Sequence, residues 1–598
     1  MKPDQWRELS RSLVEVAIGR RPADLVLRSG RWVCVQTGEI LEGMDVAISG
    51  QRIAYAGSDA GHCIGDNTRV IQADGRYLVP GLLDGHMHVE SGMITITEFV
   101  RAVLPLGTTG VFVDPHEIAN VLGLEGVRLM AEEAAAQPIH VWVQMPSCVP
   151  SAPGLETPGA SIGPEDVAEA MGWPGIIGLG EMMNFPGVIA GDRGLHQELA
   201  ETRAAGRVIG GHYASLDLGP PFHAYAAAGP EDDHEGTRLE DALARARQGM
   251  KVMMRLGSAW HDVAAQLRAV TELGLDPRHF LLVTDDSHSG TLINEGHMDR
   301  VVRHAIQQGA DPVVALQMAT LNTAEHFGVS REVGQIAPGR YADILLADDL
   351  HDLRAGLVIA RGRVAAEDGR LAIELPDYRY PAQFRSSVHL SRMLTAADFA
   401  IPVESQQPQT VQVIGVVENQ APTRRLRFEM QPAGGELVVD LARDLAKVAL
   451  VERHRGTGGI QVGFVHGFAF DRPCAVGSTV AHDSHQMLVV GTDEASMARA
   501  ANRLAEVGGG QVVVKHGEVI GLVELPIAGL MSDERAERVA HKAEQVLKGF
   551  RECGCTLNNA NMQLSLLSLV VIPELRISDK GLVDVDRFEI IPLRAEGA

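Results

Sequence analysis

Two histidines spaced two residues apart, His86 and His88, have the types and spacing that point most directly to chemistry. They lie in the sequence DGHMH, which directly follows the apolar run YLVPGLL. Side chains at positions i and i+2 of a β-strand point to the same face. His86 and His88 can therefore bind one divalent cation together, while Met87 points back toward the wall.

Further acidic and imidazole side chains lie at the ends of later apolar runs. Glu181 ends GLGE, His212 ends GGH, His234 lies in EDDHE and Asp285 lies in VTDD. A single histidine among the 23 of this chain is usually a surface or core residue, but a series at strand ends is harder to explain that way. Nitrogen and oxygen ligands of this kind suit Zn, Mn or Fe, and they suit a two-metal hydrolytic site. We therefore predict one metal site formed by His86, His88, Glu181, His212, His234 and Asp285.

These residues require a scaffold that brings strand ends together, and the central part of the chain alternates strands with helices as a (β/α)8 barrel does. A short strand is expected before His234, and helices are expected over 164–171 and 239–248. The other expected strands are Leu78–Leu83, Thr108–Asp114, Ile139–Gln144, Ile176–Glu181, Arg207–His212, Lys251–Arg255 and Phe280–Asp285. Functional side chains of such barrels lie at the carboxyl ends of the strands.

The rest of the chain divides around this barrel, which we place at 79–330. Alternating short runs predict a small β-sandwich split between 24–78 and 331–376, preceded by a short amphipathic helix within 1–23. A polar, proline-bearing linker at about 376–405 leads to a separate α+β domain at 405–598. The expected fold class is therefore α/β, with a TIM-like barrel inserted in a split β-sandwich and an α+β domain at the end.

Composition excludes several classes of protein. The chain has 598 residues, 45% of them hydrophobic and 22% charged, which is typical of globular proteins with more than one domain. A net charge of −24 argues against nucleic acid and anionic membranes as partners. We see no apolar stretch of membrane-spanning length and no secretory signal. Six scattered cysteines fit a reducing cytoplasm.

The two-part β module, the DGHMH strand, the two single histidines and the closing Asp285 resemble the amidohydrolase superfamily. Many members bridge their metals with a carbamylated lysine on the fourth strand. This chain has no lysine between Lys2 and Lys251, so Glu181 is the expected bridging ligand.

Longer motifs resemble the bacterial adenine deaminases within that superfamily. They extend over nearly the whole chain and include HVESGMITITEFV, GLGEMMNFPGV, AYAAAGPEDDHE, VTDDSH, VERHRGTG, VAHDSHQMLVVG and VIPELRISDKGLVD. Two segments depart from the family pattern. The strand-five motif reads GGHYAS around His212, and a segment near the end reads Asn559-Ala-Asn-Met.

The resemblance implies hydrolytic deamination of adenine to hypoxanthine and ammonia in purine salvage, by hydroxide activated between two divalent cations. Mn²⁺ is favoured by resemblance, with Fe²⁺ or Zn²⁺ as alternatives, and a homodimer is expected by analogy. Asp285 is expected to act as general base and then acid. Glu181 is a second catalytic candidate, as a proton donor near N1. His116 and Glu117 in DPHEIAN, with Ser287 and His288, are expected to lie near the substrate.

Other interpretations stay open from sequence. A deaminase of another aminopurine or heterocycle is the nearest alternative, and a cyclic amide hydrolase or a non-catalytic metal or ligand sensor is more distant. The zinc cytidine-deaminase fold is excluded, because its H-x-E and P-C-x-x-C elements do not occur. Trp260 and His261 are expected to be structural or lid residues. The HDSH sequence at 482–485 is expected to form structural hydrogen bonds rather than a metal site.

Overall fold

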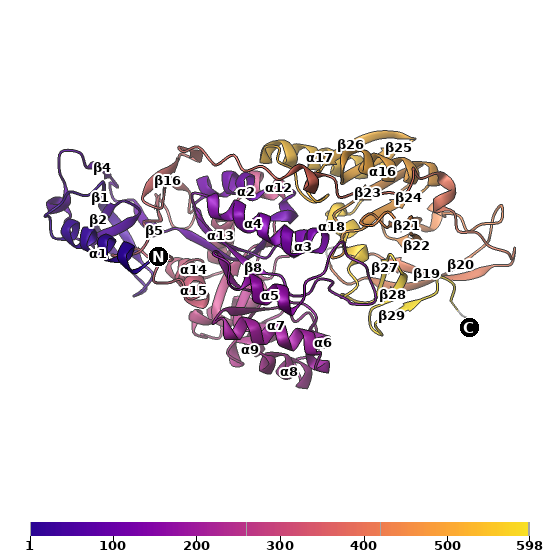
Figure 1. The fold of residues 1–598 in the computed structure, drawn as a ribbon, viewed down its shortest axis with the longest axis horizontal. Helices are drawn as coiled ribbons and strands as arrows, with labels where there is room; N and C mark the ends of the chain where they lie inside the picture. Colours follow the sequence, from indigo (N-terminus) through magenta and orange to yellow (C-terminus); the bar gives the residue numbers. More distant parts are fainter. Residues whose placement is uncertain (1, 259, 419, 596–598) are drawn as a thin grey trace.

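The computed structural model describes residues 2–258, 260–418 and 420–595, so Met1 and residues 596–598, which fall in the predicted terminal regions, lie outside it. The chain forms three connected parts along one long axis (Figure 1). The β module with the N-terminus lies at one end, the barrel in the middle and the C-terminal region at the other end. No helix among the described residues is long and apolar enough to cross a membrane.

The β module is one hydrogen-bonded sheet built from two distant parts of the chain. β15 pairs with β5 through the register Ile344↔Pro80, which joins the two parts. Helix α1 (Pro3–Ala17) buries Leu13 and Val16 against one face. The two predicted halves of the β module are thus joined in one hydrogen-bonded sheet and share one hydrophobic core. Its strands are β1 (Leu25–Cys34), β2 (Glu39–Ser49), β3 (Arg52–Gly57), β4 (Arg69–Gln72), β5 (Tyr77–Pro80), β15 (Ile344–Ala347), β16 (Ala355–Ala360), β17 (Arg363–Glu367) and β18 (Arg370–Leu371).

The barrel is made of parallel strands in a six-stranded and a three-stranded sheet, with the orders β10-β9-β8-β7-β6-β14 and β11-β12-β13. Two links join the sheets into a ring: the amide of Glu231 donates to the carbonyl of Ile209, and β13 continues through Thr284 into β14. The strands are β6 (Leu82–His88), β7 (Thr108–Val113), β8 (His140–Met145), β9 (Ile176–Met182), β10 (Val208–Gly211), β11 (Asp232–Asp233), β12 (Lys251–Arg255), β13 (Phe280–Val283) and β14 (Asp285–Asp286).

Helices between these strands pack their apolar faces on the barrel, whose strands are buried on both sides as parallel sheets require. The helices are α2 (Ile96–Val103), α3 (His116–Leu122), α4 (Leu124–Ala136), α5 (Pro164–Ala170), α6 (Phe185–Ala190), α7 (Arg193–Ala204), α8 (Pro220–Ala228), α9 (Leu239–Arg247), α10 (Val263–Gln266), α11 (Arg268–Thr271), α12 (Ser289–Asn294), α13 (Met298–Gln307), α14 (Pro312–Met318) and α15 (Leu321–His326).

The predicted barrel strands match the observed ones to within a few residues, with two exceptions. The run expected as one strand over 78–83 divides at Gly81, because β5 belongs to the β module and β6 to the barrel. The last expected strand, 280–285, divides at Thr284. The amide of Thr284 donates to Asp84 Oδ1 instead of a strand partner, so β14 restarts beside β6 with Asp285 in a left-handed conformation (φ 59°).

The predicted linker at about 376–405 is packed rather than free. The hydroxyl of Tyr380 donates to Glu133 Oε2 on α4 at 2.7 Å, and Phe399 is fully buried in the C-terminal core. The segment contains Tyr378, Tyr380, Phe384 and Phe399, but its sequence does not show which distant residues they contact. The segment therefore ties the barrel to the C-terminal region.

The C-terminal region contains an eight-stranded sheet and a three-stranded one, with α17 packed on β26 and touching the barrel. The amide of Ala536 donates to Glu98 on α2, and that of Ser532 to the carbonyl of Met93. The elements are β19 (Gln409–Gly415), β20 (Arg424–Met430), β21 (Leu445–Val451), β22 (Ile460–His466), β23 (Cys474–Ser478), β24 (Met487–Gly491), β25 (Gly510–Lys515), β26 (Glu518–Glu524), β27 (Leu575–Ser578), β28 (Gly581–Asp584), β29 (Glu589–Ile591), α16 (Glu494–Val507), α17 (Ala536–Glu552) and α18 (Ala560–Ser565).

Candidate metal centre and substrate cavity

The six predicted metal ligands lie together at the carboxyl ends of the barrel strands. Five are buried and His212 is partly exposed. Their side-chain donor atoms form overlapping groups whose members all lie within 4.8 Å of one another: His86, His88 and Glu181; His86, His234 and Asp285; Glu181, His212 and His234. The structure thus brings together every side chain of the predicted set.

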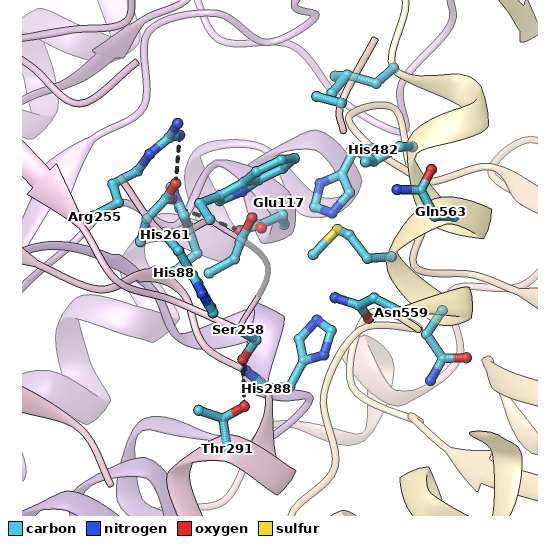
Figure 2. Close-up of a pocket in the computed structure, with 18 of the residues that line it drawn as sticks. His88, Glu117, Arg255, Ser258, His261, His288, Thr291, His482, Asn559 and Gln563 are labelled. Atoms are coloured by element: carbon cyan, nitrogen blue, oxygen red, sulfur yellow. Dashed lines mark hydrogen bonds and ion pairs between the residues drawn. The ribbon is translucent and has the colours of Figure 1, made fainter. Parts of the chain in front are cut away.

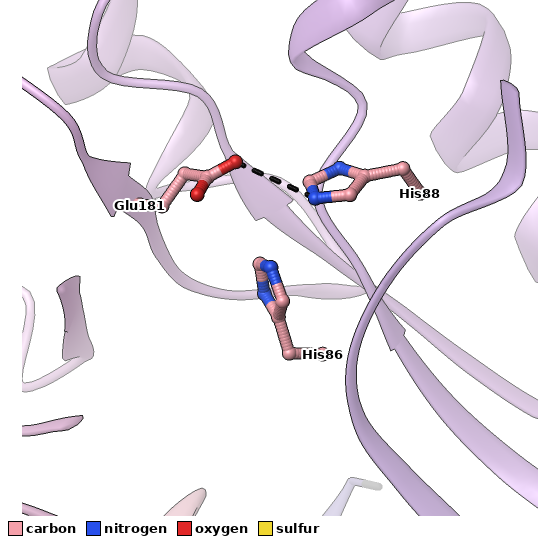
Figure 3. Close-up of side chains that lie close together, drawn as sticks. All are labelled: His86, His88 and Glu181. Carbon is pink, nitrogen blue, oxygen red and sulfur yellow. Dashed lines mark ion pairs between the residues drawn. The ribbon is translucent and has the colours of Figure 1, made fainter. Parts of the chain in front are cut away.

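Glu181 stands at the middle of this group, and its two oxygens face different partners. Oε1 lies 3.4 Å from His88 Nε2, a pair drawn in Figure 3. Oε2 lies 2.9 Å from His234 Nε2 and also contacts His212 Nδ1. A carboxylate divided between two sets of imidazoles has the arrangement of a ligand shared by two cations.

The imidazoles present lone pairs to this centre. Nε2 of His86 is buried without a hydrogen-bond partner among the described residues. Burial, followed by the neighbouring His234 and His88, holds the pKa of His86 well below its usual value, so its ring is neutral. His88 donates from Nδ1 to the carbonyl of Asp114 at 2.8 Å, which leaves Nε2 facing inward. The donor set fits a divalent cation, because imidazoles oriented by a second hydrogen bond, as His88 is, are typical ligands.

Two carboxylates around the first strand position the ligands without facing the cavity. Asp84 accepts hydrogen bonds from the amides of His86 and Thr284, and its other oxygen lies 3.0 Å from His297 Nε2. Asp114 accepts from the amide of Glu181 at 2.8 Å. These contacts fix the strand ends from which His86, Asp285 and Glu181 project.

Asp232 and Asp233 do the same on the other side of the barrel. Asp232 Oδ1 accepts from the amide of Gly211, directly before His212. Asp233 accepts from the amides of Tyr213 and Glu235, the residues directly after the two single histidines, and pairs with Arg245 at 2.9 Å. The two aspartates of EDDHE therefore position the chain around His212 and His234.

Asp285 is held in two directions by its two oxygens. Oδ1 lies 3.2 Å from His88 Nε2 and 3.7 Å from His86 Nε2, whereas Oδ2 lies 3.1 Å from the guanidinium of Arg255. Its positive φ is a strained conformation of the kind that recurs at functional sites. Asp285 is thus positioned between the candidate metal ligands and the open cavity.

Arg255 is the centre of an ion-pair network that sequence analysis did not identify. It pairs with Asp262 at 2.8 Å and also with Glu235. Burial alone would raise the pKa of Glu235, but Arg255 and then the nearby histidines lower it to about 2. The position of Arg255 at the end of β12 could have identified it as a site residue, since the other strand ends carry site residues.

The four residues predicted near the substrate divide into two groups. His116, Glu117 and His288 line the cavity, and His116 Nδ1 also lies 3.1 Å from Glu181 Oε1. Glu117 lies behind His88, with its Oε2 3.8 Å from Nδ1. Ser287 is buried and is not among the lining residues. The geometry therefore does not support a contact of Ser287 with the substrate.

A cavity of about 1370 Å³ opens beside these residues, and its opposite wall comes from the C-terminal region. Figure 2 shows His482, Asn559 and Gln563 across from Arg255, His261 and Glu117. Asp483 reaches the barrel side, with Oδ1 3.9 Å from His116 Nε2. The wall also includes Gln420, Asn561, Met562, Leu566 and the cavity-facing side of α17.

This wall corrects the interpretation of 482–485. His482 and Asp483 line the cavity, and their donor atoms group with those of His116. His485 fits the structural interpretation, since its Nδ1 accepts from the amide of Ala481. Sequence alone could not show that His482 and Asp483 face the cavity while His485 has a structural role, because their partner His116 is several hundred residues away.

Comparison with known proteins agrees with this architecture. Residues 77–368 match the amidohydrolase family, and residues 420–589 match the adenine deaminase C-terminal domain. The chain is 61% identical to adenine deaminase 3 of Rhizobium meliloti (strain 1021) over 98% of each chain. It is 60% identical to the adenine deaminase of Mesorhizobium japonicum, covering 99% of this chain and 98% of the relative. With the adenine deaminase of Moorella thermoacetica it shares 51% identity over 98% of each chain. The chain belongs to the adenine deaminases of the amidohydrolase family.

Proposed function

We propose that this protein hydrolyses adenine to hypoxanthine and ammonia. The observation that carries the proposal is the division of Glu181 between two sets of imidazoles, with Asp285 beside it at the cavity. The full-length similarity to adenine deaminases supports the choice of adenine over another aminopurine.

The ligand set divides naturally between two cations that share Glu181. His86, His88 and Asp285 would hold one, and His212 and His234 the other. Two such cations supply Lewis acidity that makes a water molecule acidic enough to attack near neutral pH. Imidazole and carboxylate ligands accept several metals, and we favour Mn²⁺ over Fe²⁺ and Zn²⁺ by family resemblance.

Asp285 is the proposed proton carrier of the reaction. In the addition step a C6–O bond forms while the π bond between C6 and N1 breaks and its electron pair moves onto N1, and Asp285 accepts the proton of the attacking water. In the second step the exocyclic C6–N bond breaks as the electron pair on N1 restores the C6–N1 double bond, and Asp285 returns the proton to the departing ammonia. The 6-hydroxypurine that remains is a tautomer of hypoxanthine. Arg255 holds Oδ2 of Asp285 in place. Both oxygens of Glu181 are engaged by histidines, so we assign it metal binding rather than proton donation.

The charge of the cavity favours a neutral base over a nucleotide. Arg255 is the single arginine or lysine among the described lining residues, and three carboxylates already occupy it. Carboxylates including Asp286 and Asp483 line the remainder. A phosphate group would meet repulsion from these carboxylates, and the described lining residues offer it no unengaged arginine or lysine.

The direct test is ammonia release from a panel of aminopurines by purified protein reconstituted with Mn²⁺, Fe²⁺ or Zn²⁺. We expect adenine to be the best substrate and hypoxanthine its product. Release from a different aminopurine at a much higher kcat/KM would overturn the substrate assignment. Ring opening of a cyclic amide without ammonia release would favour the cyclic amide hydrolase alternative, which the missing fourth-strand lysine opposes.

Compartment and assembly follow by analogy. All six cysteines are free and buried, which fits the proposed reducing cytoplasm. We propose a homodimer as the assembly, and the mass of the purified protein in solution tests it.

A further inference from the structure

Gln563 places on the far wall of the cavity a hydrogen-bond acceptor that has no partner among the described residues. It lies on α18, is 6% exposed and lines the cavity, where Figure 2 shows it across from Glu117 and Arg255. Its Nε2 donates to the carbonyl of Gln420 at 3.2 Å. Since that partner can only accept, the hydrogen bond fixes which end of the amide is nitrogen. The carbonyl Oε1 is therefore the other end of a side chain that lines the cavity, and no described residue donates a hydrogen bond to it.

The wall that carries Gln563 is held close to the metal centre. The amide of His482 donates to the carbonyl of Ser565, two residues after Gln563. The next residue, Asp483, lies 3.9 Å from His116, which in turn lies 3.1 Å from Glu181. α18 and the candidate metal ligands thus face each other through one short chain of contacts.

A purine that places C6 at the metal centre points its five-membered ring away from it. In the free base this ring carries an N–H donor, whereas a 9-substituted purine such as a nucleoside has none. We propose that Gln563 Oε1 accepts a hydrogen bond from this N–H and makes the enzyme selective for free adenine. The inference rests on the proposed deaminase function and adds a specificity-determining residue from the C-terminal region.

A second polar group on α18 supports the inference that this wall of the cavity contacts the substrate. The Oδ1 atom of Asn561 is buried without a hydrogen-bond partner among the described residues, and Asn561 also lines the cavity. Buried amides in proteins are usually paired, so an unpaired one beside a cavity indicates a ligand that completes it.

The test replaces Gln563 with methionine, which keeps the length of the side chain and removes the acceptor. Steady-state kinetics with adenine are compared with the inhibition constant of 9-methyladenine, which lacks the N–H. For Gln563→Met we expect KM for adenine to rise about tenfold with kcat within about threefold, the size of one neutral hydrogen bond. Binding of 9-methyladenine should stay the same or become tighter.

The matched control is Gln545→Met, the same change on α17 at a residue that does not line the cavity. It should leave both constants at wild-type values. A KM for adenine within twofold of wild type in Gln563→Met would overturn the inference, and so would an equal loss of adenine and 9-methyladenine binding, which indicates general damage. If wild-type protein releases no ammonia from adenine, the proposed function fails instead.

Discussion

The two walls of the cavity are built in different ways. The barrel wall takes each functional side chain from the end of a strand, and buried carboxylates such as Asp84 and Asp114 fix those ends. The C-terminal wall uses a loop and the short helix α18, where Asn561 has an amide oxygen without a partner among the described residues. We propose that the first wall is braced for cations and proton transfer, whereas the second presents side-chain amides such as those of Asn561 and Gln563 to a ligand. The difference indicates that chemistry and substrate recognition are assigned to separate parts of the chain.

The largest effect should come from Asp285 on the barrel wall. Asp285→Asn keeps an oxygen near His88 but cannot accept the proton of the attacking water. We expect kcat to fall about 10³-fold or more while the metal content stays at the wild-type level. Stopped assays for ammonia and elemental analysis of the same sample measure both. Near-normal kcat in this variant would remove Asp285 from the proton-carrier role.

Loss of the shared ligand should break the metal centre itself. Glu181→Gln removes the charge that faces His88 on one side and His234 on the other. We expect the metal content to fall from two ions per chain to one or fewer, with activity falling in parallel. Glu198→Gln is the matched control, a buried glutamate on α7 outside the cavity lining, and it should retain both ions.

On the C-terminal wall, the same kind of change should act on substrate but not on metal. Asp483→Asn removes a charge 3.9 Å from His116. We expect kcat/KM for adenine to fall several-fold to about tenfold, with two ions still bound. A loss of metal in Asp483→Asn would contradict the division of labour between the walls, and would place Asp483 with His116 as a ligand.

The smallest effect on activity should come from a buried carboxyl that belongs to neither wall. Burial, then Asp192 and Asp166, raises the pKa of Glu198 from 4.5 to about 8. Between these values the native state keeps a proton that the unfolded state has released, so this group lowers stability as pH rises from 4.5 to about 8.

Glu198→Gln removes this penalty. We expect the variant to exceed wild type in free energy of unfolding by on the order of 2 kcal/mol at pH 8, with the difference disappearing below pH 4.5. Denaturant titrations at several pH values measure the difference, and kcat should not change. A pH-independent difference would show that the charge of Glu198 is not its cause.

Site residues can be predicted from sequence where the fold brings the ends of successive strands together. Apart from His234, which follows two aspartates, each predicted ligand lies at or just after the end of an apolar run. Parallel strands place such ends at one rim, so the residue pattern groups His86 with Asp285 and the ligands between them. The pattern does not identify Arg255, although Arg255 ends β12, because an arginine is not a metal ligand and its three acidic partners are scattered along the chain.

The far wall cannot be derived from local pattern. Gln563 and Asp483 face the barrel only because α18 and the 482–485 loop pack over its mouth, a contact between segments hundreds of residues apart. The packed segment at 376–405 has the composition of a linker for a similar reason, since Tyr380 meets Glu133 only in the folded chain. Side chains near the ends of regular elements are predictable, and those positioned by domain contacts are not.

Anomalous X-ray scattering from crystals of the Mn²⁺-loaded protein tests the central claim most directly. We predict two peaks, one on each side of Glu181, with one carboxylate oxygen directed at each ion. One peak, or a second peak beyond the reach of Glu181, would contradict a centre that this carboxylate bridges.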